Sequence, residues 1–441
     1  MRRRAISVLI AGLCAFWGQG CGLSTPQHAD SSMQRAASEE YLKALSEKIK
    51  SATANLEYSG QIADEFASMV LGWKDSSNHC AVAVLAGKLA QAKQNTTSQS
   101  DIAAVERDVT RQLVAQIIRR IEPDTAEPGI FDLADVVESH KAQCLGFSQV
   151  FYITANSIGL SAKAVNVLEL EERNALPPGA SHVADIVELS DGKTIMINSV
   201  AGGHISRPFV MMDIFEIAGN YLQLKNNRHL PGIYGKIQIL DEKGLIAYIF
   251  NNRAVGHIKE GQFQVAIIDS SKAIILYPVL AEAWNNRGIA YRKMDRIRQA
   301  ISDYTRAIEL NPQYPEAWNN RGVAYMEFGQ NGDALADCDK ALEINPGFAE
   351  AYCNRGNVYS SMGQIERAIE DYGRAISHNP NLAQAYRNRG VNYALLGKTE
   401  QAKKDLTQAL RLAPSMIDNV MKVSERHNLG LKVYNAAVAA Q

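Results

Sequence analysis

The chain has 441 residues, of which 46% are hydrophobic and 21% are charged, a globular composition that excludes a mostly disordered chain. Lysine and arginine number 46 against 47 aspartates and glutamates, so the charge gives no support to nucleic-acid binding by phosphate neutralisation. Only the N-terminus is apolar enough to enter a membrane, which excludes a protein with several membrane spans. The sequence has no H-E-x-x-H and no G-x-x-x-x-G-K motif, so we expect neither a metal nor a nucleotide cofactor.

The N-terminus has the pattern of a secretory signal. Arg2–Arg4 precede an uncharged run, Ala5–Trp17, that is shorter than the ~20 residues needed to span a bilayer. The next residues, Gly18–Cys21, resemble a bacterial lipobox, which implies cleavage before Cys21 and lipidation of that cysteine. Ordinary cleavage nearby is the alternative. We therefore expect a signal peptide over 1–21, a tether over 22–50, and an exported envelope protein with a lipid anchor, on the periplasmic or outer-membrane side.

Residues 51–240 are expected to form the first domain. Apolar residues recur at helical spacing in three segments, 55–73, 78–94 and 101–122. A further helix is predicted from near Cys144 to Ile158, ended by Gly159. Strands are predicted over 163–170, 182–189 and 193–200. Helices followed by an antiparallel meander indicate an α+β fold.

The six cysteines show no C-x-x-C or other paired spacing, which argues against a disulfide framework and a zinc ribbon. His140 and Cys144 are four residues apart and could share a helix face as metal ligands, but two ligands do not define a metal site. We expect Cys80, Cys338 and Cys353 to be buried. Cys144 is either buried in the same way or a nucleophile.

Four segments of this region resemble the transglutaminase-like superfamily, a papain-related group. They are Ser139–Ser148 (SHKAQCLGFS), Gly159–Val165 (GLSAKAV), Ser181–Ala184 (SHVA) and Thr194–Ser199 (TIMINS). The family places a nucleophilic cysteine at a helix start, a histidine at the start of one strand and an aspartate on the next. The matching positions here are Cys144, His182 and Asn198. The resemblance implies acyl transfer at an amide through a thioester, followed by hydrolysis more often than by attack of an amine.

The chemistry explains why these residue types are needed. A thiol becomes nucleophilic when it ionises, and a helix N-terminus beside an imidazolium lowers its pKa. His182 would accept the thiol proton, and Asn198 would fix the imidazole tautomer, a role that asparagine fills in papain-like proteases. Backbone N–H groups at Gln143 and Cys144 could line an oxyanion site.

The turn between the last two predicted strands decides whether His182 and Asn198 meet. A three-residue loop, Ser190–Gly192, pairs Leu189 with Lys193 and puts His182 and Asn198 on the same face within diagonal reach. A two-residue Asp-Gly turn instead puts them on opposite faces, because side chains alternate along a strand.

The second half of the chain repeats with a period of 34 residues. The five blocks begin at Ala247, Ala281, Pro315, Ala349 and Ala383. Each has an aromatic residue at position 4, a small residue at position 8, alanine at positions 20 and 27, and proline at position 32. The small residues let two helices approach closely, and proline ends the second because it lacks an N–H. The pattern resembles the tetratricopeptide repeat (TPR) family, which implies an all-α solenoid over 247–416 with a capping helix over 417–441.

Position 7 of every block is arginine and position 23 is aspartate. These are Arg253, Arg287, Arg321, Arg355 and Arg389, and Asp269, Asp303, Asp337, Asp371 and Asp405. The two positions are equidistant from a turn at position 15, so we expect an Arg–Asp pair within each unit that serves register more than stability. The alternative is that both columns are solvated.

Position 6 is asparagine in every block: Asn252, Asn286, Asn320, Asn354 and Asn388. In the TPR family this position faces the concave groove, and an amide side chain can both donate to and accept from a peptide main chain. The resemblance therefore implies that these asparagines bind a protein or an extended peptide. The alternative is that they help the first helix of each unit to pack.

The sequence thus predicts a multidomain protein, an α+β transglutaminase-like domain followed by an all-α TPR solenoid. The leading hypothesis is a lipid-anchored cysteine hydrolase or acyltransferase whose repeats hold a protein partner. The rival is a non-catalytic adaptor of an envelope complex, with an inactive transglutaminase-like domain.

Overall fold

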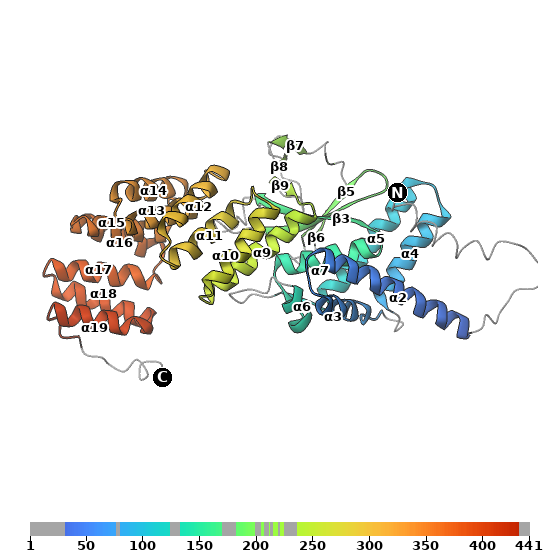
Figure 1. The fold of residues 1–441 in the computed structure, drawn as a ribbon, viewed down its shortest axis with the longest axis horizontal. Coiled ribbons are helices and arrows are strands. Elements are labelled where there is room, and N and C mark those ends of the chain that lie inside the picture. The colour runs from blue at the N-terminus through green and yellow to red at the C-terminus, as the bar shows by residue number, and fades with distance from the viewer. Residues whose placement is uncertain are drawn as a thin grey trace, which may run out of the picture. The chain divides into compact units, whose positions relative to one another are not determined.

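The computed structural model describes residues 31–75, 80–123, 133–169, 182–198, 204–206, 211, 215–218, 221–224 and 236–431 (Figure 1). The predicted signal peptide with Cys21, the start of the predicted tether and residues 432–441 lie outside the described residues.

The first described helix lies at the end of the segment predicted as a tether that leads into a helix. Helix α2 (Ser31–Asn55) occupies most of residues 22–50 and extends beyond them. Its sequence is rich in alanine, glutamate, lysine and leucine, which favour helix. Leu45 and Ile49, one helical turn apart, are buried.

The three helices predicted next are confirmed as α3 (Gly60–Leu71), α4 (Ala81–Asn95) and α5 (Gln99–Ile118). Ser59 and Ser98 cap α3 and α5, because each hydroxyl accepts a backbone N–H of the first turn. The short helix α6 (Leu133–Ser139) follows, and then α7 (Cys144–Ser157), which ends as predicted with Gly159 at φ +95°.

The three predicted strands are confirmed as β3 (Ser161–Glu169), β4 (His182–Glu188) and β5 (Thr194–Asn198). Four shorter strands were not predicted: β6 (His204–Ile205), β7 (Phe215–Ala218), β8 (Tyr221–Leu224) and β9 (Lys236–Ile239). In the described part of the chain the sheet has the order β6-β5-β4-β3-β9-β8-β7, and each neighbouring pair is antiparallel. Two-residue strands β1 (Glu122–Pro123) and β2 (Lys141–Ala142) form a separate parallel pair.

Helix α7 packs against β3 and β4. Asp185 of β4 lies on the face toward α7, because Ser148 of α7 donates a hydrogen bond to it. Side chains alternate along a strand, so Ala184 and Ile186 lie on the other face, where they join an apolar cluster with Val165.

The C-terminal part is a series of helix pairs (Figure 1). The first helices of the pairs are α9 (Glu242–Lys259), α11 (Ala281–Lys293), α13 (Pro315–Glu327), α15 (Ala349–Ser361) and α17 (Ala383–Leu395). The second helices are α10 (Phe263–Leu276), α12 (Ile297–Leu310), α14 (Asn331–Ile344), α16 (Ile365–His378) and α18 (Thr399–Leu412). Helix α19 (Ile417–Arg426) packs on α18 and is shorter than the capping helix predicted over 417–441.

The turn and the close helix approach within each pair follow the sequence columns. Position 15 has positive φ in every unit, at Gly261, Asp295, Gly329, Gly363 and Gly397. Position 8 needs a small residue because its partner at position 24 fills the space: a Cβ on Gly356 would lie 2.8 Å from Tyr372 Cε1.

The first helices form one layer. Each of α9, α11, α13 and α15 contacts the next first helix, while each second helix packs against the first helix that follows it. The first helices therefore line the inner surface of the array, which is where a ligand in its groove would lie.

Candidate functional site

The predicted Arg–Asp pairs are confirmed. Arg287 Nε and Nη2 donate to the two carboxylate oxygens of Asp303 at 2.7 and 2.9 Å, and the same two-bond contact recurs in the next three units. In the first unit Arg253 Nε lies 3.6 Å from Asp269 Oδ2. Such paired bonds fix geometry as well as charge, so each one holds the two helices of its unit in register.

The same arginines also join neighbouring units. Nη1 of Arg287 donates to Ser271 of the preceding unit at 3.2 Å, and Arg321 and Arg355 make the equivalent bonds to Thr305 and Asp339. The guanidinium groups also lie over the position 4 rings, at 4.8 Å from the Trp284 centroid. The hydrogen bond with Asp371 is the largest cause that raises the pKa of Arg355. The arginine column is thus a structural element, which removes it from the candidate ligand contacts.

The asparagine column makes hydrogen bonds between neighbouring units. Asn286 Nδ2 donates to Oδ1 of Asn251, the position 5 residue of the preceding unit, at 2.9 Å. Asn320 and Asn354 repeat this bond to Asn285 and Asn319, also at 2.9 Å. The position 6 amides therefore form a ladder that joins successive first helices, and binding of a partner by these asparagines remains a prediction.

The ladder changes at the junction between the fourth and fifth units. Position 5 of the fourth unit is Cys353, and Asn388 Nδ2 donates both to Cys353 Sγ at 4.0 Å and to Asn357 Oδ1 at 2.7 Å. A hollow of about 450 Å³ lies here, lined by side chains of α13, α15, α16 and α17 that include Asn357, Ser360 and Arg387. Sequence reasoning missed this site, although its signal was present: position 5 reads Asn, Asn, Asn, Cys, Arg along the array.

Acidic residues occupy position 2 of the first helices in the middle units, at Glu282, Glu316 and Glu350, whereas the fifth unit has Gln384. Burial raises the pKa of Glu282 and Glu316. The carboxylates of Glu282 and Glu350 raise the pKa of Glu316 further, because like charges disfavour ionisation. The middle units therefore carry a row of glutamates, the glutamate stripe, beside the asparagine ladder, and burial favours the neutral forms of Glu282 and Glu316.

Cys144 begins α7 as predicted. Its thiol sulfur accepts backbone N–H bonds from Val183 of β4 and from Leu145 and Cys144 itself at the helix start. The sulfur therefore lies beside the peptide bond that joins His182 to Val183. Burial nevertheless raises the pKa of the Cys144 thiol above its ordinary value, and the N–H bonds offset only part of this. The described surroundings thus shift the pKa in the direction opposite to the predicted activation.

The predicted hairpin register is confirmed. Leu189 N–H donates to the Lys193 carbonyl at 2.7 Å, Gly192 has φ +79°, and Asp185 pairs with Ile197. Counting along the same ladder places the backbone of Asn198 opposite Ala184, two residues from His182. The side chains of His182 and Asn198 lie outside the described residues, so the catalytic triad remains a prediction.

Asp185 was missed by sequence reasoning. It is fully buried in β4, and Ser148 Oγ donates to its Oδ1 at 2.8 Å, while Oδ2 has no hydrogen-bond partner. Burial raises the pKa of this carboxyl well above its ordinary value, because desolvation disfavours the charged form. An aspartate inside the apolar strand HVADIVE was the available signal.

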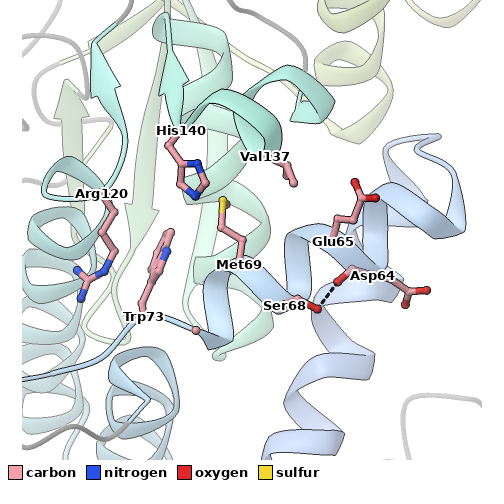
Figure 2. A pocket seen from close by; sticks show the side chains of 9 residues that line it. Asp64, Glu65, Ser68, Met69, Trp73, Arg120, Val137 and His140 are labelled. Carbon is pink, nitrogen blue, oxygen red and sulfur yellow. Dashed lines mark hydrogen bonds between the residues drawn. The ribbon is translucent and has the colours of Figure 1, made fainter.

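A second pocket, of about 720 Å³, lies between α3, α6 and the residue that follows α6 (Figure 2). Figure 2 shows Met69, Trp73 and His140 at one end, with Asp64 and Glu65 farther along α3. His140 directly follows the last residue of α6 and has φ +58°, and its backbone N–H donates to the Val136 carbonyl at 2.9 Å. It therefore precedes α7, and the suggestion that His140 and Cys144 share a helix face is wrong.

None of the described helices is long and apolar enough to cross a bilayer.

Comparisons with known proteins identify only the repeats. Residues 281–314, 315–348, 349–382 and 383–416 each match the tetratricopeptide repeat family. No curated protein matches the chain.

Three of the similar solved structures illustrate this likeness. The crystal structure of MamA protein is 26% identical and covers 39% of this chain and 94% of its own, with a TM-score of 0.32. YrrB, described as a TPR protein with an unusual peptide-binding site, is 21% identical over 41% of this chain and 92% of its own, with a TM-score of 0.32. The first TPR domain of Spaghetti (RPAP3), bound to HSP90 peptide SRMEEVD, is 27% identical over 26% of this chain and 93% of its own, with a TM-score of 0.26. The family matches and the helix pairs together show that residues 281–416 form an all-helical tetratricopeptide repeat solenoid.

Proposed function

We propose that the protein is an adaptor whose TPR array binds an extended segment of a partner protein along its first helices. The observation that carries this proposal is the hollow at the junction of the fourth and fifth units, lined by polar side chains of successive first helices. Asparagine, serine and arginine side chains there can pair with peptide groups or side chains. Specific pockets beside main-chain contacts are a recurrent way of binding extended peptides.

Filling the hollow tests the proposal. Val391 lines it and lies on α17, so Val391→Trp should block binding of a peptide. Leu395 is on the same helix, is 53% exposed and does not line the hollow, so Leu395→Trp is the matched control. Peptides are first selected on the wild-type protein from a library of short random sequences. Binding is then measured by fluorescence polarisation. Failure to select any peptide, or equal loss of binding in both variants, contradicts the proposal.

Export and lipid anchoring complete the proposal. They rest on the basic residues Arg2–Arg4, the apolar run and Cys21 in the sequence. Labelled palmitate should be incorporated into the wild-type protein expressed in bacteria and not into Cys21→Ser. Labelling of both proteins, or of neither, contradicts anchoring at this residue.

A second candidate function is acyl transfer at Cys144. The supporting observation is the position of the sulfur, which accepts N–H bonds at the start of α7 and lies beside the peptide bond that follows His182. In this reaction the thiolate attacks an amide carbonyl, the amine leaves with a proton from His182, and water then hydrolyses the thioester and regenerates the thiol. If the reaction does not occur, the domain has the inactive role of the rival hypothesis.

The pH dependence of alkylation separates the two roles. If His182 activates the thiol, iodoacetamide should modify Cys144 below the ordinary cysteine pKa of ~8.5, and His182→Ala should move that inflection upward. The described surroundings alone raise the pKa of the Cys144 thiol. Without activation by His182, alkylation should therefore rise only at a pH above the ordinary cysteine pKa, in the wild type and in His182→Ala alike. Cys338 and Cys353 are internal controls, because burial raises the pKa of each to about 12.

A further inference from the structure

The hollow opens where the repeated hydrogen-bond pattern of the array is interrupted. In the three preceding junctions the position 6 asparagine bonds to a position 5 asparagine. At the fourth junction Asn388 donates to Cys353 Sγ at 4.0 Å and also to Asn357 Oδ1 at 2.7 Å, and Asn357 accepts a second hydrogen bond from the Tyr372 hydroxyl at 2.9 Å. The floor of the hollow is thus a satisfied polar network, because Ser360 in turn donates to Asn392 at 3.0 Å.

Arg387 is the charged side chain of this hollow, and it has nothing to bind there. It occupies position 5 of the fifth unit, and its buried Nε has no hydrogen-bond partner. Among the described residues no ion pair involves Arg387, although the arginine two residues later is fully engaged with Asp405. A guanidinium that is partly desolvated and unpaired is costly, and a carboxylate would satisfy it with charge-assisted hydrogen bonds.

The row of glutamates in the first-helix layer ends before the fifth unit. Glu282, Glu316 and Glu350 occupy position 2 in the second, third and fourth units, and the fifth unit replaces the acid with Gln384. Arg387 therefore stands at the end of the glutamate stripe. A peptide that crossed the layer would meet carboxyl groups at one end and a guanidinium at the other, which favours one direction of binding.

Resting on the proposed peptide-binding function, we propose that the hollow is a subsite for an aspartate or glutamate side chain of the bound peptide, held by Arg387. The lining comes from three successive first helices, so the peptide main chain passes over the hollow and a side chain enters it.

The experiment uses the full chain and random peptides displayed with their C-termini fused to the carrier, so that no terminal carboxylate is present. Selected peptides are synthesised with amidated C-termini, and their affinities are measured for the wild type, Arg387→Gln and Arg411→Gln. Arg411 is exposed on α18, and its substitution removes the same charge away from the first helices. Each peptide is also made with its aspartate or glutamate replaced by the corresponding amide.

We expect selected peptides to share an acidic residue, and Arg387→Gln to weaken their binding by about tenfold or more while Arg411→Gln does not. The amide-substituted peptides should bind the wild type and Arg387→Gln equally. If peptides bind the wild type and Arg387→Gln alike, this inference is wrong and the peptide-binding function stands. If the selected peptides share no acidic residue, the side-chain subsite is wrong. If no peptide binds the wild type, the proposed function itself fails.

Discussion

The close packing within each repeat predicts opposite effects for the same substitution at two glycines. A Cβ on Gly356 would lie 2.8 Å from Tyr372 Cε1 and 3.0 Å from Cδ1. That ring is 1% exposed, and its hydroxyl bonds to Asn357, so it has little freedom to move. A Cβ on Gly256, in the interior of α9, meets nothing within 4 Å.

The magnitudes follow from two opposing effects. Alanine is favoured over glycine inside a helix by roughly 0.5–1 kcal/mol. Overpacking a filled site costs about 1–3 kcal/mol. Gly256→Ala should therefore stabilise the array by roughly 0.5–1 kcal/mol, whereas Gly356→Ala should destabilise it by about 1–2 kcal/mol.

Urea denaturation followed by far-ultraviolet circular dichroism measures both variants, with the shift of the midpoint read against the wild type. Gly356→Ala should also weaken binding of a selected peptide, because displacement of Tyr372 disturbs the hydrogen bond to Asn357 in the hollow. A Gly356→Ala protein as stable as Gly256→Ala would refute the argument that position 8 is small because position 24 fills the space.

Three further predictions concern single contacts. Arg389 lacks the bond to the preceding unit that its counterparts make, because Gly373 has no side chain to accept it; a Cβ added there would lie 3.7 Å from Arg389 Nη1. In urea denaturation, Gly373→Ser should therefore be more stable than Gly373→Ala by about 0.5–1.5 kcal/mol. Equal stability of the two variants would contradict this prediction. Arg321→Lys, which loses the paired bonds to Asp337, should lower the urea midpoint, and an unchanged midpoint would show that the pair is dispensable. Because burial raises the pKa of Asp185, the folded state binds a proton that the unfolded state releases, so wild-type stability should fall as pH rises through the folded-state pKa of Asp185. Asp185→Asn should remove this pH dependence from the melting temperature. Parallel pH profiles of the two proteins would contradict the raised pKa.

The adaptor proposal and the acyl-transfer proposal depend on different parts of the molecule and can fail separately. Peptide binding depends on the first-helix layer, where an unpaired arginine and a polar hollow are present. Acyl transfer depends on whether an imidazolium can overcome the burial that raises the pKa of the Cys144 thiol. The alkylation profile and the peptide measurements therefore give independent answers.

Local and periodic features of this protein were determined by the sequence itself. The repeat of 34 residues fixed the helix pairs, and the symmetric spacing of Arg287 and Asp303 about their turn predicted the ion pair, because contacts within one hairpin depend only on nearby residues. The three-residue turn ending at Gly192 likewise set the register of β4 and β5. Strands β6–β9 were not foreseen, since strands of two to four residues are too short to show an alternating pattern.

Contacts between elements distant in the chain were decided only by the tertiary structure. An asparagine at position 6 has the same sequence signal whether it binds a ligand or its neighbour, and only the packing of successive first helices turned Asn320 toward Asn285. The pKa of Cys144 also depends on how deeply its helix start is buried against β4, which no local motif specifies. The physical reason is that desolvation and hydrogen-bond competition depend on every group that surrounds an atom, whereas a sequence pattern describes only neighbours along the chain.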